Sequence, residues 1–108
     1  MSRKIPKIRF DAFQRQGGNC YYCGQPMWLS HAKQFAKQHR ITQVEAKKHR
    51  CTAEHLIARQ DGGTNTSSNI VAACVYCNSR RHRTSEALDP PEYQIHVQKC
   101  LLRGEWHL

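Results

Sequence analysis

Residues 51–83 read CTAEHLIARQDGGTNTSSNIVAACVYCNSRRHR. The first eight residues, 51–58, are mostly apolar or tolerant of extended backbone, and residues 59–69 are dense in residues that favour turns. Residues 69–73 then have the composition of a second short strand, and the pattern over residues 75–83 predicts a helix. The segment therefore predicts the order strand, long loop, strand, helix.

Two Cys-X-X-Cys pairs accompany this segment, Cys20 with Cys23 and Cys74 with Cys77. A chain without an export signal is expected to keep its thiols reduced, so its six cysteines favour metal binding over disulfides. Each pair can place two thiolates on one ion, and together they predict a tetrahedral structural Zn²⁺ site. Cys51 and Cys100 stand apart from the pairs and are expected to be buried as small apolar residues.

Helices are expected on both sides of this core. Phe10 and Phe13 with a following Gly-Gly predict a short helix over residues 9–16, and Ser30 is placed as the cap of a second helix. Asp89, two prolines and Glu92 predict the start of a C-terminal helix over about residues 90–103. A chain of 108 residues suits one small domain over residues 1–108, so the expected fold class is a small, zinc-stapled α+β domain.

The charge balance favours a polyanionic partner. Lys and Arg number 17 against 8 Asp and Glu, which gives a formal net charge of +9, and such an excess attracts nucleic acid. A dense positive run over residues 33–50 is interpreted either as a solvated face or as a phosphate-contacting surface. No apolar stretch approaches the length of a membrane span, and the basic start lacks the apolar segment of a secretory signal. A cytoplasmic location is therefore expected.

Four residues in the core segment carry the chemistry of a one-metal phosphodiesterase. Glu54 and His55 end the first strand, Asn69 opens the second, and Asn78 follows Cys77. A carboxylate and an amide oxygen suit a hard divalent ion such as Mg²⁺ and leave positions open for a phosphate. A neutral histidine beside them can deprotonate water if a hydrogen bond orients its ring. Asn69 is expected to provide that constraint.

Over roughly residues 10–84 the chain resembles the HNH endonuclease family, which has a ββα-metal fold. The resemblance is carried by C-Y-Y-C at 20–23, E-H-L-I-A-R at 54–59, D-G-G-T-N-T-S-S-N-I at 61–70 and C-V-Y-C-N-S-R-R at 74–81. It implies that His55 is the general base and that Asn69 positions it. It also implies that Glu54 and Asn78 bind the catalytic Mg²⁺ or Mn²⁺, and that the four paired cysteines bind the structural Zn²⁺.

The expected nucleic-acid contacts are basic side chains that bracket this site in sequence, namely Arg59, Arg80, Arg81, Arg83 and His82. His82 lies one helical turn after Asn78, so it could also approach the metal. Tyr21, Tyr22 and Trp28 are expected in the core, whereas the remaining histidines are expected at the surface or on helices, namely His31, His39, His49, His96 and His107.

The sequence departs from the family pattern at two positions. Glu54 stands where the family more often has Asp, and Asn78 stands where many members have His. The function that follows is a metal-dependent endonuclease acting on DNA, expected to be double-stranded. The alternative is a weakly active or inactive zinc-stapled module that binds nucleic acid within a phage or restriction assembly. The sequence identifies no protein partner.

Overall fold

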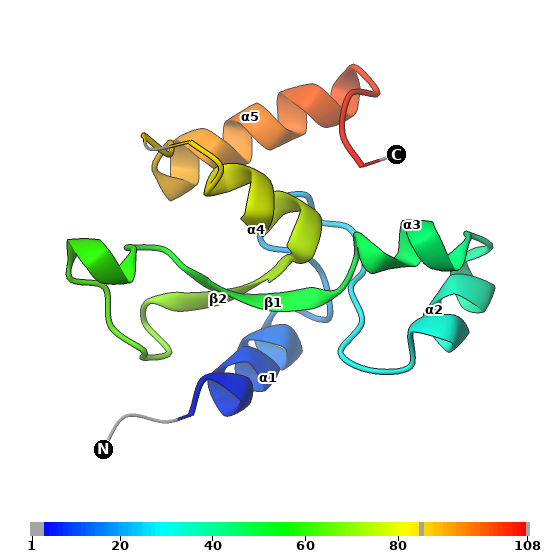
Figure 1. The fold of residues 1–108 in the computed structure, drawn as a ribbon, viewed down its shortest axis with the longest axis horizontal. Helices are drawn as coiled ribbons and strands as arrows, with labels where there is room; N and C mark the ends of the chain where they lie inside the picture. The colour runs from blue at the N-terminus through cyan, green and yellow to red at the C-terminus, as the bar shows by residue number, and fades with distance from the viewer. Residues whose placement is uncertain (1–3, 85, 108) are drawn as a thin grey trace.

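The structure is a computed structural model and describes residues 4–84 and 86–107. Its elements are α1 (Ile5–Arg15), α2 (Ala32–His39), α3 (Gln43–Lys47), β1 (Cys51–His55), the 3₁₀ turn η1 (Arg59–Asp61), β2 (Ile70–Cys74), α4 (Val75–Arg81) and α5 (Pro90–Leu102) (Figure 1). The order of β1, β2 and α4 confirms the expected ββα core and the small α+β class.

The two strands form an antiparallel hairpin in which Cys51 pairs with Cys74 and His55 pairs with Ile70. Every residue of β2 is buried, because α1 and α4 lie on opposite sides of the hairpin (Figure 1). The first strand ends at His55, three residues before its predicted end. It ends there because the chain turns into the loop, where Leu56 N–H donates to the carbonyl of Asn69 and the Asn69 side chain holds Ile57.

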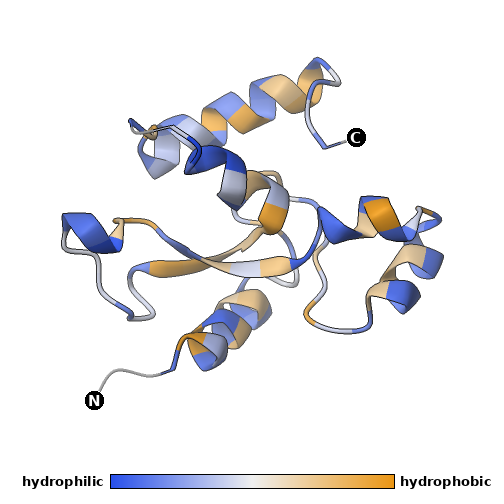
Figure 2. Ribbon diagram, viewed as in Figure 1, coloured by the Kyte–Doolittle hydropathy of each residue, from blue (hydrophilic) through white to orange (hydrophobic). Residues whose placement is uncertain are grey.

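The main core surrounds the paired cysteines. Buried residues from the N-terminal half, the hairpin and α5 pack together there, and they include Ala12, Tyr22, Met27, Cys51, Ala72 and Val97. Figure 2 shows apolar residues along β2 and an alternation of apolar and hydrophilic residues along α5. The Tyr93 hydroxyl donates to the carbonyl of Cys77 at 2.6 Å, which fastens α5 to α4. Burial of Cys51, Cys100 and Tyr22 confirms their expected place in the core.

A second, smaller cluster joins α2 to α3. Phe35, Ala36 and Ala46 are buried there, and Trp28 packs against them with its indole N–H donating to the carbonyl of Ala46 at 2.7 Å. The basic residues of α2 stay on its exposed side. This cluster forms a helical lobe beside the hairpin, and the lobe contains α3, which sequence reasoning missed.

The helix termini agree with the sequence prediction at some positions and differ from it at others. Asp89 caps α5 by accepting from the Glu92 N–H at 2.9 Å, as predicted. The prediction of Ser30 as a cap is wrong, because α2 begins after His31, which adopts a left-handed conformation with φ 64° and makes no side-chain cap. The missed α3 has a clear signal, since Thr42 and Glu45 form a reciprocal capping box. The first helix starts at Ile5 rather than residue 9, with a proline in its first turn.

Candidate functional site

The four paired cysteines come together as a buried cluster. Their sulfur atoms all lie within 4.8 Å of one another, and the Sγ atoms of Cys23 and Cys74 are 3.9 Å apart. A tetrahedral Zn²⁺ with Zn–S bonds of about 2.3 Å places its sulfurs about 3.8 Å apart. The cluster therefore fits a structural zinc ion. Hydrogen bonds among the four thiols hold the pKa of Cys23 well below its ordinary value and raise the pKa of Cys74 and Cys77, so Cys23 loses its proton before those two.

A nitrogen atom lies within hydrogen-bonding distance of each of the four sulfurs. Backbone N–H groups of Cys74 and Cys77 donate to Cys20 and Cys74 at 3.3 and 3.5 Å. The C-terminal segment supplies the nitrogens for the other two sulfurs. Trp106 Nε1 donates to Cys77 Sγ at 3.2 Å, and His107 Nε2 lies 3.2 Å from Cys23 Sγ. The expectation that His107 lies at the surface is wrong, because it is only 6% exposed. These donors offset the negative charge that four thiolates place on one zinc ion.

Replacing Trp106 by phenylalanine is expected to speed zinc release to a chromogenic chelator roughly tenfold, since a hydrogen bond to a charged group contributes about 1.5–3 kcal/mol. The substitution keeps an aromatic ring against Tyr76 and removes the donor to Cys77. Trp28→Phe is the matched control, because the Trp28 indole bonds Ala46 in the other cluster. Equal release rates for the two variants would show that the Trp106 N–H does not protect the centre.

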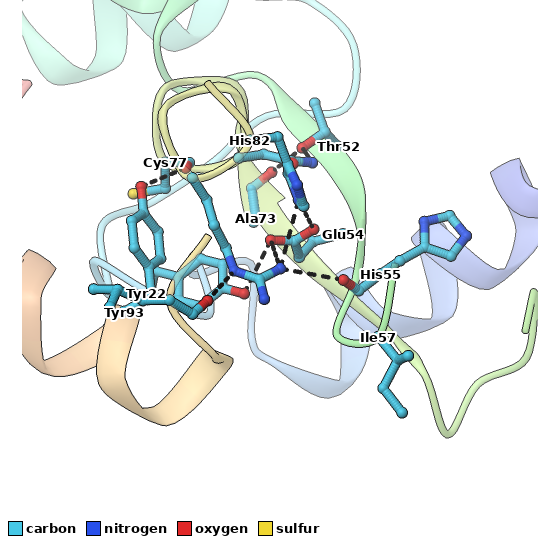
Figure 3. Close-up of polar contacts among 12 residues, drawn as sticks. Tyr22, Thr52, Glu54, His55, Ile57, Ala73, Cys77, His82 and Tyr93 are labelled. Atoms are coloured by element: carbon cyan, nitrogen blue, oxygen red, sulfur yellow. Dashed lines mark hydrogen bonds and ion pairs between the residues drawn. The ribbon is translucent and has the colours of Figure 1, made fainter. Parts of the chain in front are cut away.

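Glu54 lies in a second polar cluster, between β1 and α4. It is 1% exposed, and its Oε2 accepts from the Tyr22 hydroxyl at 2.9 Å and from Arg81 at 3.2 Å. Its Oε1 lies 2.8 Å from His82 Nε2 (Figure 3). Burial and the charge of Glu54 raise the pKa of Tyr22, which keeps that hydroxyl protonated as a donor. The carboxylate is thus buried among a phenol, a guanidinium and an imidazole.

Asn78 lies on the same side of β1 as this carboxylate. Its amide nitrogen donates to Thr52 Oγ1 at 2.9 Å and to the carbonyl of Ala53 at 3.3 Å. Thr52 and Glu54 share one face of the strand, because strand side chains alternate. The next turn of the helix brings His82 to Glu54. Glu54, Asn78 and His82 are therefore gathered between β1 and α4, and the Asn78 amide oxygen accepts no hydrogen bond within the described part of the chain.

His55 stands at the end of β1 and faces another way. Figure 3 shows its imidazole pointing away from the carboxylate of Glu54. Its Nε2 lies 2.8 Å from Asn65 Oδ1, and because this oxygen only accepts, Nε2 carries the proton and Nδ1 carries the lone pair. Sequence reasoning missed Asn65, whose only signal was its place in the turn-rich loop. The structure does not bring the ring of His55 to the other three residues.

Asn69 holds the loop that follows His55 rather than the ring itself. Its amide oxygen accepts from the Ile57 N–H at 2.8 Å, and its amide nitrogen donates to the carbonyls of Ile57 and Thr64 at 3.0 and 2.9 Å. The same loop needs glycine at position 63, where a Cβ would lie 1.8 Å from the carbonyl oxygen of Ile57. Asn69 therefore constrains His55 through the backbone two residues away, and Asn65 constrains its ring.

A cleft of about 1110 Å³ opens beside the Glu54 cluster, between residues 56–61 and the end of α4. Of the basic residues expected to contact nucleic acid, four line it, namely Arg59, Arg81, His82 and Arg83. Arg80 does not line this cleft, and its guanidinium lies 4.1 Å from the centroid of the Tyr76 ring. Arg81 is 7% exposed and bonds Glu54 and the carbonyl of Leu88. Its main contacts are therefore internal, which leaves Arg59 and Arg83 as the exposed arginines of the cleft.

Arg81→Met is expected to lower the free energy of unfolding by about 3–5 kcal/mol, because it leaves the buried Glu54 carboxylate without its cation. Arg83→Met is the control, since Arg83 is exposed and its replacement should change stability by no more than about 0.5 kcal/mol. Urea unfolding followed by circular dichroism measures both. A loss in Arg81→Met no larger than in Arg83→Met would contradict a structural ion pair between Glu54 and Arg81.

Comparison with known proteins identifies a family whose profile covers the part of the chain that contains this site. The sequence profile of the family described as HNH endonuclease matches residues 20–84. Among curated proteins, the CRISPR-associated endonuclease Cas9 of Corynebacterium diphtheriae is 30% identical over 81 residues, which cover 74% of this chain and 6% of that protein. The match thus spans a small part of the relative's length. Within the described residues, no helix is long and apolar enough to cross a membrane.

Proposed function

This chain belongs to the HNH endonuclease family, and from that premise we propose that it is a metal-dependent endonuclease that hydrolyses phosphodiester bonds in double-stranded DNA. The observation that carries the proposal is the grouping of Glu54, Asn78 and His82 between β1 and α4, beside a cleft with open basic side chains. In this proposal His55 is the general base, Glu54 and Asn78 hold one divalent ion, and the cysteine cluster holds Zn²⁺ as a structural element.

The donor set between β1 and α4 suits a hard divalent ion. Adjacent ligands on an octahedral ion with bonds of about 2.1 Å are about 3 Å apart, and Glu54 Oε1 and His82 Nε2 are 2.8 Å apart. His82 is therefore proposed as a third ligand that replaces its hydrogen bond to Glu54. Oxygen ligands from Glu54 and Asn78 favour Mg²⁺ or Mn²⁺ over softer ions. When bound, the ion supplies positive charge to the scissile phosphate and the leaving oxygen.

His55 is suited to take a proton from water. With its proton on Nε2 and held by Asn65, the ring presents Nδ1 as the basic atom that accepts a proton from water. Glu54 and His55 are consecutive at the end of β1, and their side chains leave opposite faces of the strand, so in this proposal the phosphodiester crosses the strand end to meet the His55 ring on one side and the ion held at Glu54 on the other. Arg59 and Arg83 line the neighbouring cleft, where they would contact flanking phosphates and set the position of the strand.

Supercoiled plasmid is the direct test of this function. Purified protein should nick or linearise it in Mg²⁺ or Mn²⁺ and leave it intact in EDTA, since chelation removes the hard ion first from a site with few protein ligands. The zinc content measured before and after the EDTA treatment shows whether the structural ion was retained. A zinc-loaded, folded protein that leaves plasmid intact in both metals would overturn the proposal.

Glu54→Asp is expected to lower the rate of plasmid cleavage about tenfold or more without abolishing it, because a shorter carboxylate keeps the charge but changes its distance to the ion. Mn²⁺, which is less strict about geometry, should support this variant better than Mg²⁺. The measurement is the initial rate of nicking in each metal for the native protein and the variant. A gain of activity in Glu54→Asp would mean that the native glutamate impairs the site.

One observation favours a second candidate function, a zinc-stapled module that binds nucleic acid without cutting it. Both oxygens of Glu54 are already engaged, by Tyr22 and Arg81 on one side and His82 on the other. While those contacts are in place, the Glu54 carboxylate has no free oxygen with which to bind the catalytic Mg²⁺ or Mn²⁺. This candidate predicts salt-sensitive DNA binding with no cleavage in either metal, and the plasmid assay separates it from the endonuclease.

A further inference from the structure

A second cavity lies between the α2–α3 lobe and the C-terminal segment. Its volume is about 340 Å³, and its walls include Phe35, Glu45 and three histidines, His39, His49 and His107. Figure 1 shows the C-terminal segment turning back from the end of α5 toward α3. The three imidazoles thus come from α2, from the turn before β1 and from the C-terminal segment. None of them takes part in the proposed cleavage.

Hydrogen bonds fix the tautomers of two of these histidines. His49 Nδ1 lies 3.2 Å from the carbonyl oxygen of Pro26, and since a carbonyl only accepts, Nδ1 carries the proton and Nε2 carries the lone pair. His107 Nε2 lies 3.2 Å from Cys23 Sγ and donates to it when that sulfur is a thiolate. The lone pair of His107 is then on Nδ1, which is buried and has no hydrogen-bond partner among the described residues.

Metal-binding histidines usually donate their other ring N–H to a carboxylate, a backbone carbonyl or water, which fixes the tautomer and orients the ring. The carbonyl of Pro26 fills that role for His49, and the sulfur of Cys23 orients the ring of His107. Burial, together with the neighbouring His107, lowers the pKa of His49, so its lone pair is available at neutral pH. A buried, unpartnered Nδ1 on His107 also calls for a ligand.

The two rings are close enough to share one ion. Their centroids are 5.0 Å apart with an angle of 57° between the ring planes. Two imidazoles on one tetrahedral ion, with metal–nitrogen bonds of about 2.0–2.1 Å, have centroids about 5 Å apart. Among the described residues, only the four cysteines bring three or more such ligand atoms within 4.8 Å of one another. An ion shared by this pair would therefore take two protein nitrogens and complete its coordination with water.

We propose that His49 and His107 bind a divalent transition-metal ion, of the class of Zn²⁺, Ni²⁺ or Co²⁺, in this cavity, in addition to the zinc ion of the cysteine cluster. Imidazole nitrogen selects such borderline ions over Mg²⁺. The bound ion would join the C-terminal segment to the turn before β1. It would thereby strengthen the closure that Trp106 and His107 make over the cysteines.

The test is a zinc titration of full-length protein that already holds one Zn²⁺ per chain by metal analysis. Isothermal calorimetry should show a second equivalent binding to the native protein. His49→Gln, which keeps a polar side chain of similar reach, should weaken that second event by more than about tenfold, as loss of an imidazole ligand requires. His96→Gln is the matched control, because His96 lies on α5 against Cys100 and Tyr93 and outside the cavity.

Each alternative gives a different result. A native protein that binds no second Zn²⁺ overturns the proposal. Unchanged affinity in His49→Gln overturns it as well. If the second Zn²⁺ binds in the Glu54 cluster, the second binding event will be absent in His82→Ala and present in His49→Gln. That result contradicts the assignment of the site to His49 and His107. Retention of the first Zn²⁺ in every variant shows that the cysteine cluster is intact, so the outcome is independent of whether the protein cleaves DNA.

Discussion

Replacing His55 by alanine is expected to abolish plasmid cleavage while leaving zinc content, folding and DNA binding at native levels. Loss of a general base typically costs about 10²–10⁴-fold in rate. The ring contacts Asn65 in the loop, and Asn69 holds that loop independently through Ile57 and Thr64. The fold should therefore survive the substitution, and the loss should be confined to the chemical step.

The matched control for His55→Ala is His31→Asn. His31 is an exposed histidine in a left-handed conformation that asparagine tolerates, and it lies outside the site. Cleavage should be unchanged in this control, and filter binding at fixed salt should give the same affinity for both variants. If His55→Ala loses DNA binding together with cleavage, the residue has a structural role and not the one assigned. Cleavage retained at the native rate would remove His55 from the mechanism.

Removing zinc is expected to unfold the protein outright. Apparent binding energies of structural Zn²⁺ reach about 10–16 kcal/mol, which matches or exceeds the whole stability of a typical domain, about 5–15 kcal/mol. Here the cysteines join the segment after α1 to the end of β2 and the start of α4, and the main core packs around them. Circular dichroism during titration with a strong zinc chelator should show loss of helix in step with loss of metal.

Cys77→Ser should reproduce the effect of chelation, because it removes one of the four ligands. Cys100→Ala should retain one Zn²⁺ per chain, since Cys100 is buried on α5 and stands outside the cluster. This pair tests the choice of four cysteines among six. A metal-free protein that still unfolds cooperatively, with native helix content, would show that the cluster is not what stabilises the fold.

Several features of the fold followed from local patterns. The paired cysteines, the hairpin, α4 and the Asp89 cap each depend on residues within a few positions of one another, or on spacing that a single ion imposes. The family profile confirms the resemblance that these patterns carried. The missed α3 was also local, because its capping box, Thr42 with Glu45, was readable in the sequence.

Other features required the tertiary structure, because they depend on how separate elements are placed. The rotation of α4 about its axis turns Arg81 and His82 toward Glu54, whereas the sequence predicted Arg81 as a nucleic-acid contact and gave His82 either that role or an approach to the metal. Asn65 rather than Asn69 meets the ring of His55, since that depends on the path of an irregular loop.

The sequence by itself determined which residue types are present and which metal chemistry they can support. Only the tertiary structure decided which side chains meet, as in the contacts of Trp106 and His107 with sulfurs far away along the chain. The physical reason is the distance along the chain over which each signal acts. Cysteine pairs, helix caps and turns depend on residues that are close together in the sequence. The partners of a buried charge or a fixed imidazole depend instead on packing between distant segments.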